Sequence, residues 1–139
     1  MAEHQVQVRV RYSETDQMGV VYHGNYIPYF EIGRVEWLRN KGISYKSLEE
    51  RGIALPIASM TLNYKKSAKY DDLLTIKTKF KKYSGVKIEF DCEIFNESNE
   101  LLTNAYFLLV FVDIKTGRPI CPPDEILAIV SEQINQILY

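Results

Sequence analysis

The feature that most constrains the fold is one long apolar stripe at helical spacing, placed ahead of a series of strand patterns. Between about Asn25 and Lys41, the positions that recur with a period near 3.6 are Tyr26, Tyr29, Phe30, Gly33, Trp37 and Leu38. A glycine inside a helix costs about 1 kcal/mol relative to alanine, so Gly33 predicts the close approach of another element, such as a sheet. We therefore expect a central helix that is buried over much of its circumference.

The ends of this helix carry recognisable signals. Asn25 is placed to cap the first turn with its side-chain oxygen, and Pro28 is tolerated so early because its missing N–H has no helical partner. Gly42 can supply the left-handed residue that follows the last turn. A shorter helix, capped by Ser44, is predicted for residues 44–51.

The rest of the chain alternates in the manner of strands. The apolar face of a half-buried strand ahead of the helix is formed by Val6, Val8, Val10 and Tyr12. After the short helix, strand-like stretches occupy residues 53–66, 73–83, 86–95 and 101–114. Strands in series separated by tight turns favour an antiparallel meander, and the single long helix must then cover one of its faces.

Three details of these segments carry further predictions. Pro56 marks an edge or a bulge, because proline cannot donate a ladder hydrogen bond. The apolar run within residues 101–114 is typical of a strand that lies centrally or is covered on both faces. A terminal amphipathic helix follows Pro122 and Pro123, with its apolar positions at Ile126, Leu127, Ile129, Val130, Ile134 and Ile137.

Length and composition describe an ordinary globular chain. Its 139 residues are expected to form one domain, residues 1–139, and a net charge of −1 gives no electrostatic reason to expect nucleic acid or an anionic membrane. Cys92 and Cys121 have no metal-like spacing, so they are expected to be free structural thiols. Without a signal segment or an apolar run of roughly 20 residues, the expectation is a cytoplasmic protein with no membrane insertion.

The connection from Ser13 to Tyr26 concentrates the residues that can carry chemistry. It holds a carboxylate, a flexible glycine and a histidine between two regular elements that would fix its geometry. The apolar run of residues 20–22 is expected to anchor this loop against the core. Asp16 and His23 would then lie close to buried surface, where their ionisation can be tuned.

The segment Asp16–Tyr26 (DQMGVVYHGNY), followed by Phe30, Glu31 and Arg34, resembles the hotdog-fold thioesterases of the 4-hydroxybenzoyl-CoA thioesterase family. The pattern is most similar to the acyl-CoA thioesterase branch associated with the Tol–Pal system. The resemblance implies an α+β hotdog fold, with an antiparallel sheet of about five strands around a long central helix, plus a C-terminal helix. It also implies hydrolysis of acyl-CoA to a free acid and coenzyme A by a homodimer or homotetramer, without metal or other cofactors.

The same resemblance gives roles to the loop residues. Asp16 would be the catalytic carboxylate, acting as a nucleophile or as a general base for water. Backbone N–H groups at the start of the helix would polarise the thioester carbonyl. His23 would orient Asp16, a water or the thioester oxygen. The residues that would position Asp16 and contact the substrate are Gly19, Val20, Val21 and Tyr22.

Several of these residues also have a purely structural interpretation. An aspartate before a glycine commonly hydrogen-bonds its own turn, and a histidine near a helix start often supports packing. Tyr22 fits an apolar anchor. Glu31 and Arg34 are spaced to form an ion pair on the helix surface, or they face the site or a partner subunit.

A basic stretch lies between Asn63 and Ile88. It contains eight lysines and two aspartates, which give a local net charge of +6. Solvated strand faces with edge-protecting lysines are one interpretation. The other is a surface for the phosphates of coenzyme A, to which Lys81, Lys82 and Ser84 would contribute.

Two other functions are compatible with the same fold. A hotdog enoyl-CoA hydratase or dehydratase needs an acid and a base across the α and β carbons, for which His23 and Glu31 are available. A non-catalytic acyl-CoA binding protein is the second alternative, because a fold alone does not imply catalysis.

Overall fold

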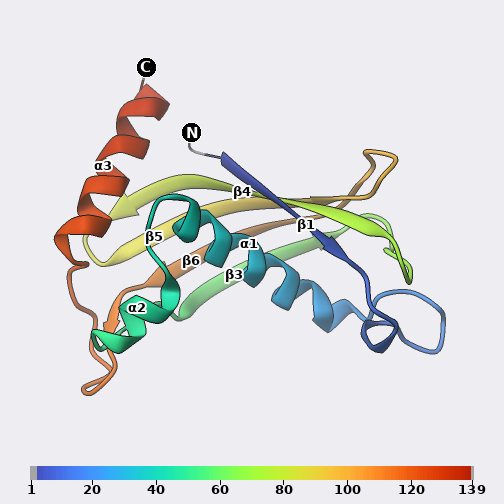
Figure 1. Ribbon diagram of the computed structural model, residues 1–139, viewed down its shortest axis with the longest axis horizontal. Helices are drawn as coiled ribbons and strands as arrows, with labels where there is room; N and C mark the ends of the chain where they lie inside the picture. Colours follow the sequence, from blue (N-terminus) through green and yellow to red (C-terminus); the bar gives the residue numbers. More distant parts are fainter. Residues whose placement is uncertain (1–2, 139) are drawn as a thin grey trace.

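The computed structural model describes residues 3–138 of the chain, without the side chains of residues 135–138 (Figure 1). Ile137, expected as an apolar position of the last helix, lies outside the described side chains. The strands are β1 (Glu3–Arg9), β2 (Ile53–Ala54), β3 (Ile57–Tyr64), β4 (Leu73–Ser84), β5 (Lys87–Phe95), β6 (Leu101–Val110) and β7 (Val112–Asp113). The helices are α1 (Tyr26–Asn40), α2 (Tyr45–Glu50) and α3 (Asp124–Leu138), with short 3-10 turns η1 (Tyr12–Glu14) and η2 (His23–Asn25).

The main sheet is antiparallel and has the strand order β1-β4-β5-β6-β3, while β2 and β7 pair separately. α1 lies across one face of this sheet, and α3 lies at the end remote from the loop that precedes α1 (Figure 1). Five strands packed on a long helix, with a further helix at the C-terminus, confirm the expected α+β hotdog fold.

The meander expected for the last four strand stretches is wrong for the first of them. β4, β5 and β6 are neighbours in chain order, but β3 pairs with β6 instead of β4. Both sides of β4 are occupied, by β1 and by β5, and β3 joins the sheet at its other end, beside β6. As a result, β1 and β3 are the two edge strands.

The contact between α1 and the sheet explains the glycine in the helix. The apolar stripe of α1 is buried, as expected. At Gly33 an added Cβ atom would lie 2.5 Å from Oγ1 of Thr78 and 2.8 Å from Cγ2 of Ile76, both on β4. The close approach predicted from Gly33 is therefore confirmed.

The ends of the helices are as expected with one exception. Gly42 has a left-handed φ of +93°, and Ser44 Oγ accepts a hydrogen bond from the N–H of Ser47 at 3.1 Å. Asn25 does not cap α1 with its side chain, which corrects the expectation. Because η2 precedes α1, Asn25 is already helical, and its Nδ2 donates to the carbonyl of Glu14 at 2.8 Å instead.

Three strands are shorter than the sequence pattern suggested. β1 ends at Arg9, and Tyr12 begins η1 with an exposed ring. The first stretch divides into β2 and β3 around Pro56, and the last divides into β6 and β7 at Phe111. β6 is an interior strand, as expected, and its buried residues lie mainly on one face.

No helix within residues 3–138 is long and apolar enough to cross a membrane. In the same part of the chain, no group of three or more His, Cys, Asp or Glu side chains is arranged to hold a metal ion. Cys92 and Cys121 are both free, the first buried and the second exposed.

Candidate active site

Asp16 closes a tight turn in the loop between β1 and α1. Its N–H donates to the carbonyl of Val20 at 2.8 Å, and its carbonyl accepts from Gly19, whose φ is +79°. Its Oδ1 accepts from the N–H of Met18 at 2.8 Å. Within residues 3–138, Oδ2 forms no described hydrogen bond, and the side chain is exposed. One carboxylate oxygen therefore holds the turn, and the other is available to a substrate.

The loop docks on the connection between β3 and β4. The N–H of Val21 donates to the carbonyl of Ala68 at 2.9 Å, Val20 pairs with Lys69, and Val21 is only 3% exposed. Tyr22 is 48% exposed and packs its ring against the imidazole of His23, with ring centres 4.3 Å apart. Val21 is therefore the anchor that the sequence predicted, whereas the expectation that Tyr22 anchors the loop is wrong.

Glu14 ties this loop to α1, a role that sequence reasoning missed. Its carbonyl accepts from the N–H of Tyr22 and from Nδ2 of Asn25, and its Oε1 accepts from the hydroxyl of Tyr29 at 2.8 Å. Burial acts to raise the pKa of Glu14, but hydrogen bonds from Arg11 and Tyr29 outweigh it and lower that pKa. Only the i, i+3 spacing of Arg11 and Glu14 offered a signal in the sequence.

A hollow of about 280 Å³ surrounds Asp16. The residues that line it are Asp16, Val20, Val21, His23, Tyr26, Tyr64, Lys65, Lys66 and Ser67. Tyr64 donates its hydroxyl hydrogen to the carbonyl of His23 at 3.0 Å. No hydrogen bond described for residues 3–138 joins Asp16 to the exposed His23 imidazole. The predicted substrate residues Gly19 and Tyr22 belong to the loop but do not line the hollow.

The 3-10 turn η2, which leads directly into α1, supplies hydrogen-bond donors beside this hollow. In the described part of the chain, the N–H groups of His23 and Gly24 donate to no protein acceptor, whereas that of Asn25 donates to Tyr22. Free N–H groups at a helix N-terminus stabilise negative charge, such as that on a carbonyl oxygen under attack. The loop between β1 and α1 thus holds both a carboxylate oxygen and N–H donors for which no partner is described within residues 3–138.

The residues predicted to bind phosphate are not near Asp16 within one subunit. β4 begins at Leu73, beside the end of β1, and Lys81 lies eight residues further on, about 26 Å along the strand. Lys82 and Ser84 follow it and are exposed. Lys65 and Lys66 of the same basic stretch do line the Asp16 hollow.

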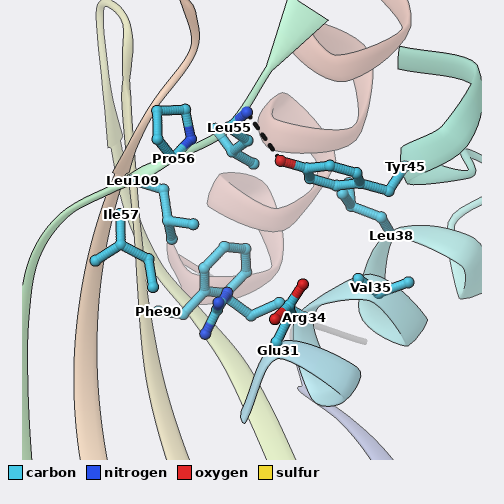
Figure 2. A pocket seen from close by; sticks show the side chains of 10 residues that line it. All are labelled: Glu31, Arg34, Val35, Leu38, Tyr45, Leu55, Pro56, Ile57, Phe90 and Leu109. Atoms are coloured by element: carbon cyan, nitrogen blue, oxygen red, sulfur yellow. Dashed lines mark hydrogen bonds between the residues drawn. The ribbon is translucent and has the colours of Figure 1, made fainter. Parts of the chain in front are cut away.

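A second hollow, of about 230 Å³, lies beside the later part of α1 (Figure 2). Its lining residues are Glu31, Arg34, Val35, Leu38, Tyr45, Leu55, Pro56, Ile57, Phe90 and Leu109. Glu31 and Arg34 form none of the ion pairs described for residues 3–138, so the predicted helix-surface ion pair is wrong. Arg34 is instead buried over the ring of Phe107, with its guanidinium carbon 4.4 Å from the ring centre.

Comparison with known proteins adds to this geometry. Residues 10–130 match the model of the thioesterase-like superfamily. The chain is 37% identical over 121 residues to the acyl-CoA thioester hydrolase YbgC of Escherichia coli, and this match covers 87% of this chain and 90% of that protein. It is 34% identical over 122 residues to the acyl-CoA thioesterase YbgC of Haemophilus influenzae, with 87% and 89% covered.

A solved structure is similar over almost the whole chain. The DHNA-CoA thioesterase from Staphylococcus aureus has a TM-score of 0.89 and 36% sequence identity, and the match covers 99% of this chain and 92% of that one.

Proposed function

This chain belongs to the thioesterase-like superfamily, and we propose that it hydrolyses acyl-CoA thioesters to a free acid and coenzyme A, with Asp16 as the acting carboxylate. One observation supports this assignment above the others. Among the hydrogen bonds described for residues 3–138, none involves Oδ2 of the exposed Asp16 or the N–H groups of His23 and Gly24, which begin the turn η2 that leads into α1.

The chemistry needs few groups. The carbonyl oxygen of the thioester accepts hydrogen bonds from the helix-start N–H groups, which stabilise the negative charge that develops on it. As a nucleophile, Asp16 attacks the carbonyl carbon, the C–S bond breaks, and coenzyme A leaves as a thiolate. Water then hydrolyses the acyl–aspartyl anhydride and restores the carboxylate. As a general base, Asp16 instead takes a proton from the water that attacks the same carbon.

The proposal includes a second copy of the chain. β3 is an edge strand whose residues are mostly exposed, among them Ile57, Met60 and Tyr64. An exposed edge with apolar side chains is a template for strand pairing. Antiparallel pairing of β3 with its copy about a two-fold axis joins the two sheets and covers these side chains. The expected assembly is a homodimer, or a homotetramer of two such dimers.

Positive side chains serve the phosphates of coenzyme A in this proposal. Lys65 and Lys66 line the Asp16 hollow directly. The end of the sheet that holds the first residue of β3 also holds Lys81, Lys82 and Ser84 on β4. Three strand spacings, about 14 Å, separate β4 from β3 there. In the proposed dimer this end faces the partner's Asp16 loop, and we expect these residues to contact the partner's coenzyme A.

A thiol-release assay over a series of acyl-CoA thioesters tests the function. Asp16→Asn retains a side-chain oxygen for the turn but removes the carboxylate, and its turnover is expected to fall by at least about 100-fold. Asp113→Asn is the matched control, because Oδ1 of Asp113 accepts from the N–H of Lys115 in a similar turn outside both hollows. Full turnover by a folded Asp16→Asn protein would overturn the proposal.

Two arms of this experiment address the alternative functions. An enoyl-CoA that is hydrated faster than a saturated acyl-CoA is hydrolysed would favour the hydratase. Tight binding of acyl-CoA without release of thiol would favour a non-catalytic binding protein. Neither result is expected, and a cytoplasmic location stays a prediction.

A further inference from the structure

Arg34 is a buried cation that takes part in no hydrogen bond or ion pair described for residues 3–138. Arg34 is 8% exposed, and its Nη1 atom is buried with no hydrogen-bond partner among the described residues. It reaches from α1 into the second hollow, beside Phe90, where most of the other lining side chains are apolar (Figure 2). A buried charge normally has a hydrogen-bonded partner, because the loss of its hydration is strongly unfavourable.

Among the described residues, the surroundings of Arg34 supply no hydrogen-bond partner for Nη1. The guanidinium of Arg34 lies over the ring of Phe107. This cation–π contact gives Nη1 no oxygen or nitrogen acceptor for a hydrogen bond. The nearby thiol of Cys92 is uncharged, because burial raises its pKa to about 12. Glu31 lies at the same hollow but is exposed and forms no ion pair with Arg34. The guanidinium of Arg34 therefore lines a mostly apolar hollow, and no hydrogen bond described for residues 3–138 satisfies its Nη1.

We propose that Arg34 is a specificity-determining residue: its guanidinium donates to an oxygen carried near the far end of the acyl group, and it selects such thioesters over hydrocarbon ones. This inference rests on the proposed thioesterase function and deepens it. The apolar walls take the carbon skeleton of the acyl group, and the oxygen satisfies the guanidinium. A hydrocarbon of the same shape leaves Arg34 unpaired in a cavity that it has closed to water.

The proposed dimer brings the Arg34 hollow of one subunit to the Asp16 hollow of the partner subunit. Ile57, at the first position of β3, lines the Arg34 hollow, and Tyr64, at the last position, lines the Asp16 hollow. Seven residue steps separate them by about 23 Å along the strand. When β3 pairs antiparallel with its copy about a central two-fold axis, Ile57 of one subunit lies beside Tyr64 of the partner subunit. The Arg34 hollow of each subunit therefore adjoins Asp16 of the partner subunit.

Isosteric pairs of substrates measure the selection directly. 4-Hydroxybenzoyl-CoA and 4-methylbenzoyl-CoA differ only in a hydroxyl or a methyl group, and glutaryl-CoA and 5-methylhexanoyl-CoA differ in a carboxylate or a branched methyl end. The wild type is expected to prefer the oxygen-bearing member of at least one pair by about tenfold or more in kcat/KM. The pair that shows this preference tells whether a neutral or an anionic oxygen is recognised.

Variants at Arg34 then separate recognition from structure. Arg34→Met keeps the length of the side chain but removes the donor, so the preference is expected to disappear, mainly through KM. Arg34→Lys keeps the charge and retains part of the preference. Arg39→Met is the control, because Arg39 is an exposed arginine on the same helix that pairs with Glu36. A purely structural Arg34 would instead lower activity on both members of a pair equally.

Mixed dimers test the route between the two hollows. A mixed dimer contains one Asp16→Ala subunit and one Arg34→Met subunit. In the intersubunit arrangement, one of its two sites has both residues intact, because the Arg34→Met subunit supplies Asp16 and the Asp16→Ala subunit supplies Arg34. That site is expected to have the wild-type preference, although neither parent dimer shows it. If Arg34 acts with Asp16 of its own subunit, the mixed dimer has only the unselective activity of Arg34→Met.

The outcomes distinguish this inference from the proposed function. Equal rates for both members of both pairs, in a wild type whose activity depends on Asp16, would overturn the role of Arg34 and leave the thioesterase intact. A mixed dimer that retains only unselective activity would overturn the intersubunit arrangement. Absence of thiol release from every substrate would overturn the proposed function itself.

Discussion

The hydroxyl of Tyr29 donates to Oε1 of Glu14 at 2.8 Å, and this bond joins the buried face of α1 to the loop that carries Asp16. The carbonyl of Glu14 accepts two further hydrogen bonds, from Tyr22 and Asn25, on the other side of that loop. These hydrogen bonds of Glu14 therefore hold the loop that carries Asp16 against the start of α1.

Loss of this hydroxyl is expected to affect both stability and turnover. Tyr29→Phe keeps the buried ring but removes one hydrogen bond to a carboxylate, which lowers the free energy of unfolding by about 1–3 kcal/mol. Turnover is expected to fall several-fold, because the loop is held less firmly. Urea titration and thiol release measure the two effects. Tyr70→Phe, at an exposed tyrosine, is the control and should change neither.

Acidification should weaken the fold through Glu14. Its pKa is lowered in the folded state, so its contribution to stability is complete above the unfolded pKa of 4.5 and is lost as the pH falls through the lower folded value. The midpoint of urea unfolding should therefore decrease below about pH 4.5. In Glu14→Gln this decrease should be smaller. An identical pH dependence in both proteins would show that Glu14 is not the group responsible.

Gly33→Ala should destabilise the protein although alanine is the better helix former. The gain of about 1 kcal/mol in helix propensity is outweighed by contacts of 2.5 Å with Thr78 and 2.8 Å with Ile76. A net loss of about 1–3 kcal/mol is expected from overpacking. Adding Thr78→Ala to Gly33→Ala should recover part of it, whereas Thr78→Val, which keeps the volume, should not.

A charge at the edge of β3 should prevent dimer formation. Met60 is 43% exposed next to the middle of this strand, so Met60→Lys places two lysines close to each other across the proposed two-fold axis. Light scattering should give a smaller mass, and thioesterase activity should fall with it. Tyr12→Lys, at a residue that is 78% exposed and outside β3, serves as the control. A monomeric wild type would contradict the proposed assembly.

The two cysteines should differ in reactivity toward a thiol reagent. Cys92 is 1% exposed, and burial raises its pKa to about 12, so it has neither access nor thiolate character. Cys121 is exposed. The native protein should therefore titrate one thiol at once, and the unfolded protein should titrate two. Rapid reaction of both in the native state would contradict the burial of Cys92.

Much of the fold could be predicted because its patterns are local. The helical stripe of α1, the glycine at 33 and the cap at Ser44 each follow from propensity or periodicity within a few residues. The same is true of the turn around Asp16, where an aspartate and Gly19 are close in the chain. These features need no knowledge of what packs against them, apart from the existence of a sheet.

The pairing of β3 with β6, the junction at Glu14 and the burial of Arg34 were decided only by the tertiary structure. Strand order depends on which edges remain vacant after the other strands have paired, and no periodicity contains that information. Glu14 and Tyr29 meet because the loop folds back on α1, and Arg34 is buried because the sheet places Phe107 beneath it. Spacing suggested a solvated ion pair between Glu31 and Arg34, but contacts between residues far apart in the chain placed Arg34 in a cavity instead.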